Sequence, residues 1–332
     1  MNIYIAMGNT AVRDSFFTPN ALEKVRELGD VRLFDQPELS CGKETLMQEL
    51  EETEVLFTGW GAPRIDEEIL AHARCLKIHA HVGGSVAPYI SKEEYDRGIR
   101  VLSGNDLYAK SVAEGCLTYT LMALRQLPGV ISFMQKEGWK PDVVMDNGLI
   151  GKKVGLVGYG AIARYYAELL KWFQVDLSVY SGHISEEELH RIGARRASKE
   201  EIFANCDVIS LHSALNDANY GMITSDLIKL IKKDALFVNT ARAGLIDSAS
   251  LMAELETGRF RAVLDVYDEE PLPLDSPYRR MPNVMLLPHV AGPTSDMREV
   301  VVLSLAEDIL KIDRGEPSRH SIPYDYAIRM TK

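Results

Sequence analysis

The sequence predicts an α/β protein with two doubly wound parallel-sheet domains. Short apolar runs alternate with amphipathic stretches along most of the chain, which is the pattern of parallel strands connected by helices. In the second half the apolar runs are nearly continuous, as expected for strands that are buried on both faces. The chain has 332 residues, more than a single hydrophobic core usually holds.

The first hundred residues predict five strands and three helices. The expected strands are short apolar runs at 2–7, 31–35, 54–60, 76–82 and 99–104. The expected helices have apolar residues at helical spacing over 19–29, 43–53 and 66–73. The following stretch, 111–127, is apolar on most faces, so we expect a helix that is buried or lies in an interface.

A second α/β series begins at Lys152. Its expected strands cover 153–160, 175–181, 206–213, 235–241, 261–267 and 284–290. Residues 295–317 predict one long helix, and 318–332 receive no assignment.

Composition excludes several classes of protein. Apolar residues make up 46% and charged residues 26%, which is typical of a soluble globular protein. No apolar stretch reaches the roughly 18 residues of a membrane span, and no signal peptide is evident. The net charge of −11, without a long basic run, disfavours nucleic acid and membrane surfaces as partners. The four cysteines form no CxxC pair, which favours a cytoplasmic location and predicts no metal site.

A glycine-rich turn separates an expected strand from a helix at Gly158-Tyr-Gly160-Ala-Ile-Ala163. The first glycine allows a tight turn, and Gly160 allows close approach of a pyrophosphate. The N–H groups of Ala161 and Ile162 would then face the phosphates at a helix N-terminus. We therefore predict a dinucleotide site, with a purely structural turn as the alternative.

Charged groups follow three of the later strands. Arg242 comes after one strand, Asp265 and Glu270 lie in and after the next, and His289 follows the last. Each alone could be a solvent-exposed loop charge or a satisfied core histidine. Together they suit reduction of a 2-keto acid, because arginine can bind a carboxylate and polarise a carbonyl. Histidine can transfer the proton, and a carboxylate beside it stabilises the imidazolium.

These segments resemble a known family. The runs "GKKVGLVGYGAIA", "CDVISLHSAL", "LFVNTARAGLID", "LDVYDEEPLP" and "LLPHVAG" are similar in order and spacing to the motifs of the D-isomer-specific 2-hydroxyacid dehydrogenases, the phosphoglycerate dehydrogenase-like group. The resemblance covers about residues 76–317. It implies a Rossmann dinucleotide-binding domain, 103–295, inserted into a flavodoxin-like substrate domain, 1–102 plus 296–332.

The resemblance also implies roles for individual residues. Arg242, Glu270 and His289 would be the catalytic set. Around the nicotinamide half of the cofactor we expect Arg242 and His289 themselves with Thr240, Ala241, Asp265 and Gly292. The helix at 111–127 resembles the one through which family members dimerise, so we expect a homodimer.

The substrate side departs from the family pattern. Val82, Gly83 and Gly84 could hold the substrate carboxylate with their amides, together with Arg242, or form a plain surface turn. The family's usual Gly-Val-Asp is replaced after Gly84 by Ser-Val-Ala, and its Asn-x-Pro-Gly is absent from "SGNDLYAKSVAE". The sequence therefore does not name the acid.

The cofactor preference is also open. An acid at the second strand end would hydrogen-bond the ribose of NAD and repel the 2′-phosphate of NADP. Here that position is Ser181, followed by Gly182 and His183, in a stretch similar to the Tyr-Thr-Gly-Arg of NADP-preferring glyoxylate/hydroxypyruvate reductases. We expect both NAD and NADP to be accepted.

Two other functions fit the same fold. Some relatives act as nucleotide-sensing corepressors or scaffolds, but here the reactive trio is complete. Formate dehydrogenases share the architecture, yet their histidine is paired with a glutamine, whereas Glu270 stands here. The sequence therefore predicts an NAD(P)-dependent oxidoreductase that acts on a D-2-hydroxy acid/2-keto acid pair.

Overall fold

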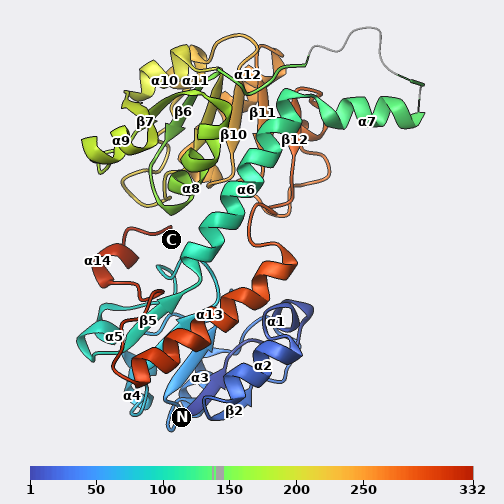
Figure 1. The fold of residues 1–332 in the computed structure, drawn as a ribbon. Coiled ribbons are helices and arrows are strands. Elements are labelled where there is room, and N and C mark those ends of the chain that lie inside the picture. Colours follow the sequence, from blue (N-terminus) through green and yellow to red (C-terminus); the bar gives the residue numbers. More distant parts are fainter. Residues whose placement is uncertain (137, 140–145, 332) are drawn as a thin grey trace. The chain divides into compact units, whose positions relative to one another are not determined.

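The computed structural model describes residues 1–136, 138–139 and 146–331 (Figure 1). The chain divides into two compact units. Unit 1 comprises Met1–Ala109 and Pro293–Lys332, and unit 2 comprises Lys110–Gly292. The chain thus passes between the units after residues 109 and 292. The domain boundaries predicted from the sequence lie after residues 102 and 295.

Unit 1 is built on a five-stranded sheet in the order β2-β1-β3-β4-β5. Every neighbouring pair is parallel, which is the flavodoxin-like arrangement that the sequence predicted. All five expected strands are present. They are β1 (Asn2–Ile5), β2 (Asp30–Leu33), β3 (Val55–Thr58), β4 (Ile78–His81) and β5 (Arg100–Ser103).

Helices cover both faces of this sheet (Figure 1). They are α1 (Ala11–Phe16), α2 (Pro19–Arg26), α3 (Lys43–Glu49), α4 (Glu67–His72), α5 (Lys92–Asp96), α13 (Ser295–Asp313) and α14 (Tyr324–Ala327). The C-terminal segment, which received no assignment, is part of this unit. The N–H of Ile322 donates to the carbonyl of Val101 at 2.9 Å, and Ala327 and Met330 complete a small apolar cluster.

Unit 2 is built on a seven-stranded sheet in the order β12-β11-β10-β9-β6-β7-β8. All pairs are parallel, and the order reverses between β6 and β9, as in a Rossmann domain. The predicted fold class is therefore confirmed. The strands are β6 (Lys153–Val157), β7 (Asp176–Tyr180), β8 (Ala194–Arg196), β9 (Val208–Leu211), β10 (Leu236–Asn239), β11 (Arg261–Leu264) and β12 (Val284–Leu286).

Two apolar clusters, one on each face of this sheet, form the core of unit 2. The helices are α7 (Leu127–Lys136), α8 (Ala161–Leu170), α9 (Glu186–Ile192), α10 (Lys199–Asn205), α11 (Ser225–Leu230) and α12 (Ser248–Glu256), with short 3-10 turns at Lys171–Phe173, Ala243–Leu245 and Pro277–Arg280.

The helix expected at 111–127 is α6 (Asn105–Leu124). Its apolar character is largely explained inside unit 2, since Ala113, Cys116 and Leu124 are buried in the core. Helix α7 follows and extends away from the sheet of unit 2 (Figure 1). Within the described residues no side chain of α7 is buried, so uncovered apolar surface lies on α7. In the part of the chain that the structure describes, no helix is long and apolar enough to cross a membrane.

Candidate active site

The glycine turn has the geometry that a dinucleotide needs. Gly158 has φ +98°, and a Cβ there would lie 2.5 Å from the backbone nitrogen of Ser213, so only glycine fits. Gly160 caps α8 without a side-chain hydrogen bond in the described chain, and the space beside its Cα is open. The first turn of α8 can therefore approach a pyrophosphate with free N–H groups.

Arg242 is held by a short turn at the end of β10. The side chain of Asn239 accepts from the N–H of Ala241 at 3.0 Å and donates to the carbonyl of Arg242 at 3.2 Å. The guanidinium donates to the carbonyl of Ala241 at 2.7 Å. Burial lowers the pKa of Arg242, while the negative charges of Glu270 and Asp265 oppose that shift. The side chain therefore remains cationic.

His289 and Glu270 form a hydrogen-bonded pair at the same edge of the sheet. Nδ1 of His289 lies 2.7 Å from Oε2 of Glu270, and the two side chains are 45% and 36% exposed. The other carboxylate oxygen accepts from the N–H of Tyr267 at 2.9 Å. Burial raises the pKa of Glu270, but the hydrogen bonds from His289 and Tyr267 and the charge of Arg242 outweigh it, so the net pKa is below its usual range. Glu270 is thus an ionised partner for the histidine.

Asp265 fixes the backbone that follows the histidine. This carboxylate is fully buried and accepts from the N–H groups of Val290 at 2.8 Å and Ala291 at 2.9 Å. Burial raises the pKa of Asp265, and the two amide hydrogen bonds act against that rise. Asp265 therefore holds the backbone at Val290 and Ala291 in place. It does not occupy the pair of Glu270 and His289, which can face a ligand.

The residues expected around a nicotinamide also gather in unit 2. The Thr240 hydroxyl lies 2.9 Å from the sulfur of Cys116, and the carbonyl of Gly292 accepts from Ser111 at 3.3 Å. Both positions follow strands whose carboxyl ends share one edge. No group of three or more His, Cys, Asp or Glu residues that could hold a metal ion occurs within 1–136, 138–139 and 146–331.

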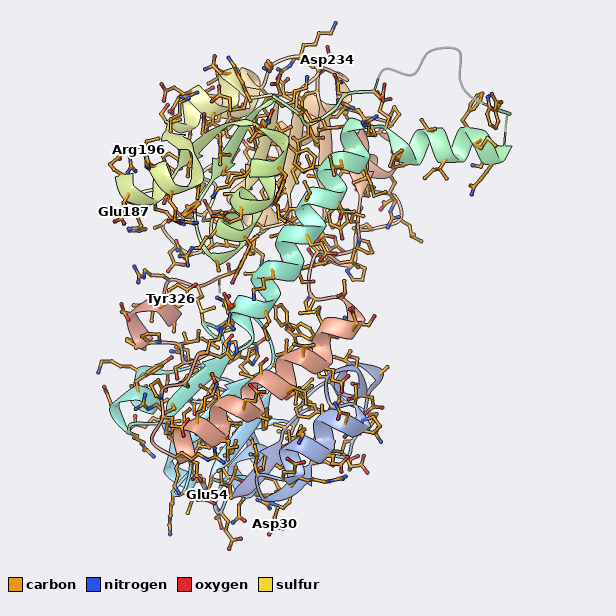
Figure 2. All side chains as sticks on the ribbon, in the orientation of Figure 1. Asp30, Glu54, Glu187, Arg196, Asp234 and Tyr326 are labelled. Atoms are coloured by element: carbon orange, nitrogen blue, oxygen red, sulfur yellow. The ribbon has the colours of Figure 1, made fainter. Side chains whose placement is uncertain are left out.

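At the end of β7 the structure adds a residue that sequence reasoning missed. The hydroxyl of Ser181 accepts from the N–H of His183 at 3.2 Å. Arg196, which is labelled in Figure 2, lies at the end of β8. Its guanidinium donates to the carbonyls of Ser181 at 3.0 Å and Ile184 at 2.7 Å and pairs with Glu186 at 2.8 Å. An arginine therefore does reach this strand end, from a neighbouring strand. The available signal was the short Ala-Arg-Arg run between two helices.

Val82–Gly84 lie in unit 1, directly after β4. The N–H of Val82 donates to the carbonyl of Thr58 at 2.9 Å. The carbonyls of Gly83 and Gly84 accept from the hydroxyl of Ser103 at 3.1 and 2.6 Å. Within the described residues the N–H groups of Gly83 and Gly84 donate to no other group, so the turn offers two donors to a ligand.

Comparison with known proteins defines the class of this chain. The family model described as "D-isomer specific 2-hydroxyacid dehydrogenase, NAD binding domain" matches residues 117–291, more than half of the sequence. The chain belongs to the D-isomer specific 2-hydroxyacid dehydrogenase family, which confirms the resemblance of its motifs. Unit 2 is accordingly a nicotinamide-cofactor domain.

Similar proteins include reductases and dehydrogenases. A D-3-phosphoglycerate dehydrogenase of Methanocaldococcus jannaschii is 30% identical over 90% of this chain and 56% of its own length. The chain spans about half the length of the phosphoglycerate dehydrogenases that it matches. A glyoxylate reductase of Thermococcus litoralis is 28% identical, with 90% of this chain and 91% of that protein covered. The crystal structure of a phosphoglycerate oxidoreductase from Vibrio cholerae has a TM-score of 0.69 at 29% identity and covers 95% of this chain and 99% of its own.

Proposed function

We propose that this protein is an NAD(P)-dependent D-2-hydroxyacid dehydrogenase that interconverts a 2-keto acid and the corresponding D-2-hydroxy acid. The observation that carries the proposal is the hydrogen-bonded pair of His289 and Glu270 in the same unit as Arg242, at the carboxyl edge of a dinucleotide-binding sheet. The names of its relatives, glyoxylate reductase and phosphoglycerate dehydrogenase, support a small 2-keto acid as substrate.

Each member of the trio has a distinct task in the proposed reduction. Arg242 binds the acid and polarises its carbonyl, because a guanidinium can donate two parallel hydrogen bonds. His289 donates its proton to the carbonyl oxygen as that oxygen becomes a hydroxyl. Glu270 stabilises the imidazolium before the transfer. Hydride comes from the reduced nicotinamide when that cofactor is bound. In unit 1 we propose the N–H groups of Gly83 and Gly84 as a site for the acid's carboxylate. The expected contribution of the Val82 amide is wrong, because that N–H already donates to the carbonyl of Thr58.

A panel of 2-keto acids, assayed with NADH and NADPH by loss of nicotinamide absorbance, tests this function. We expect turnover of at least one small 2-keto acid, and loss of turnover in Arg242→Ala with cofactor affinity retained. The matched control is Arg259→Ala, because Arg259 pairs with Glu254 away from the trio. Cofactor binding without turnover of any keto acid would instead favour a nucleotide-sensing protein without catalysis.

We infer that both NAD and NADP are accepted, with NADP favoured more than in relatives that have an acid at the strand end. Ser181 cannot repel a 2′-phosphate, and His183 and Arg196 supply nearby positive or donor groups. Ser181→Asp should lower kcat/KM with NADPH by about tenfold and leave NADH nearly unaffected. Ser225→Asp, which adds the same charge at the start of α11, is the control. Equal kcat/KM ratios for the two variants would contradict the assignment.

We further propose that the protein is a homodimer, with α7 as part of the interface. Leu127, Ile131 and Met134 on α7 are 38%, 49% and 51% exposed, and an apolar stripe of this kind is typical of an interaction surface. Ile131→Glu should shift the sedimentation coefficient from that of a dimer toward that of a monomer, whereas Lys136→Glu should not. A cytoplasmic location, and the absence of nucleic acid and membrane partners, stay predictions from the sequence.

A further inference from the structure

A line of four polar side chains in the core of unit 1 has no role in the proposed mechanism. It consists of Glu94 from α5, His79 and His81 from β4 and Thr58 from β3, all at most 1% exposed. Thr58 is the register partner of His81, and the two histidines, two positions apart, share one face of the strand. Four polar groups at this depth are costly unless each is hydrogen-bonded.

The hydrogen bonds run in a single line. Oε2 of Glu94 lies 2.8 Å from Nδ1 of His79, Nε2 of His79 lies 2.8 Å from the hydroxyl of Thr58, and the same hydroxyl lies 3.0 Å from Nδ1 of His81. The second oxygen of Glu94 accepts from the N–H of Ser91 at 3.1 Å. With two donors directed at it, the Glu94 carboxylate is the accepting end of the line.

The hydroxyl of Thr58 has one proton and lies between two ring nitrogens, so it can donate to only one of them. If His79 is neutral with its proton on Nδ1, Thr58 donates to His79 and accepts from Nδ1 of His81. Nε2 of His81 is then an acceptor. If His79 is an imidazolium, Thr58 donates to His81 instead, and Nε2 of His81 becomes a donor.

The free end of the line lies under the proposed carboxylate site. Nε2 of His81 is buried and has no hydrogen-bond partner among the residues that the structure describes. It lies against Gly83, where any Cβ would collide with the ring. Burial lowers the pKa of His81 to about 3, so this ring stays neutral and can only exchange one tautomer for the other.

We propose that this relay of Glu94, His79, Thr58 and His81 takes up one proton when an anion binds at the Val82–Gly84 turn. A proton from solvent bonds to Nε2 of His81 while the Nδ1 proton of that ring passes to the hydroxyl of Thr58. The original hydroxyl proton passes to Nε2 of His79, whose positive charge is held by Glu94. The turn thereby gains a donor beneath Gly83 and a buried positive charge nearby. The inference rests on the proposed function, because it assumes that the ligand is the acid's carboxylate.

The titratable and charged groups beside the relay do not accept the incoming proton themselves. The ring of Tyr89 lies 4.4 Å from that of His81, and Tyr95 is next to Glu94 in α5. Burial raises the pKa of both phenols. Tyr108 lies near Tyr89, its pKa is raised by burial, and the positive charge of Arg298 acts against that rise. These neutral phenols and the arginine leave the pair of Glu94 and His79 as the proton acceptor.

Proton uptake can be counted by calorimetric titration of the enzyme–NADH complex with oxamate, an amide analogue of a 2-keto acid, in buffers with different heats of ionisation. The titration uses His289→Asn, which removes uptake by the catalytic histidine. We expect the His289→Asn variant to take up about one proton per oxamate bound. Adding Thr58→Val should abolish that uptake and weaken oxamate binding by about tenfold, because the line is cut at its centre.

Controls separate the relay from a general loss of packing. Thr120→Val removes a buried hydroxyl that is hydrogen-bonded to Tyr166 at 3.0 Å in unit 2, and it should leave uptake unchanged. Thr58→Ser keeps the hydroxyl and should retain the uptake, and Glu94→Gln provides a second way to abolish it should Thr58→Val fail to fold. If Thr58→Val or Glu94→Gln takes up the same number of protons with the same oxamate affinity, the relay is refuted. Failure of the otherwise unaltered protein to bind oxamate would overturn the proposed function first.

Discussion

In the part of the chain that the structure describes, each unit contains a histidine within hydrogen-bond distance of a glutamate, and the two pairs have opposite surroundings. His289 and Glu270 in unit 2 are 2.7 Å apart and 45% and 36% exposed, whereas His79 and Glu94 in unit 1 are 2.8 Å apart and both fully buried. The exposed pair can exchange a proton with a ligand or with water. The buried pair can exchange one only through Thr58 and His81. Burial, rather than the chemistry of the pair, makes the pair in unit 2 the one that we propose for catalysis.

The surroundings follow from local structure. Glu270 and His289 lie in loops after β11 and β12, at the edge where parallel sheets bind ligands. His79 lies within β4, and Glu94 is drawn inward because it closes the capping box of α5 with Ser91. A buried carboxylate is costly to desolvate, and removing one member of its buried hydrogen-bonded pair is costly, while an exposed pair contributes little to stability.

The largest expected effect separates the two histidines by activity. His289→Asn should lower kcat for keto-acid reduction by about 10²–10⁴-fold, because the general acid is removed. His79→Asn should change kcat by far less. Steady-state kinetics at saturating cofactor measures both, and equal losses in the two variants would contradict the division of roles.

The next effect separates the two glutamates by stability. Glu94→Ala leaves a buried histidine and the Ser91 N–H without an acceptor and should lower the free energy of unfolding by about 3–5 kcal/mol. Glu270→Ala is the matched variant of the exposed pair and should change it by no more than about 1 kcal/mol. Urea denaturation measures both values. A Glu94→Ala protein as stable as the wild type would show that His79 and the Ser91 N–H do not need Glu94 as their acceptor.

A smaller effect sharpens the role of Glu270. Glu270→Gln removes the negative charge that holds a proton on His289, so the fall in reduction rate toward alkaline pH should begin about one pH unit lower. The pH profile of kcat detects this shift. An unchanged profile with reduced activity would mean that Glu270 only orients the ring.

The smallest effect concerns the stability of the exposed pair at different pH. The pKa of Glu270 is lowered in the folded protein, so the stability that this carboxylate contributes is present above the unfolded pKa of about 4.3 and is lost as pH falls through the lower folded value. The difference in Tm between wild type and Glu270→Gln should therefore shrink in acid. A difference that grows as the pH falls would contradict this sign.

The sequence predicted both sheets and every strand except β8, because an apolar run marks each of the other strands. Strand β8 has only three residues, two of them arginines, so no apolar periodicity marked it. Many of the short helices, such as α9 and α10, lay in polar stretches where the capping serines were the only local signal.

The candidate site was predictable where a motif fixed both the residue and its position, as for Arg242, Glu270 and His289. The structure places Glu270 within hydrogen-bond distance of His289 and close enough to Arg242 for that charge to lower its pKa. Arg196 was missed because it comes from the unpredicted β8. The relay was missed for another reason. Thr58, His79 and Glu94 are far apart in sequence, and only the register of β3 with β4 and the inward turn of α5 bring them together.

The backbone at His289 has an evolutionary consequence. Its φ of +55° is a left-handed conformation that asparagine and glycine adopt more readily than histidine. A change of His289 to asparagine needs one nucleotide and relieves the backbone while it removes the proposed proton donor. In this fold, selection for stability and selection for turnover therefore act in opposite directions at one codon.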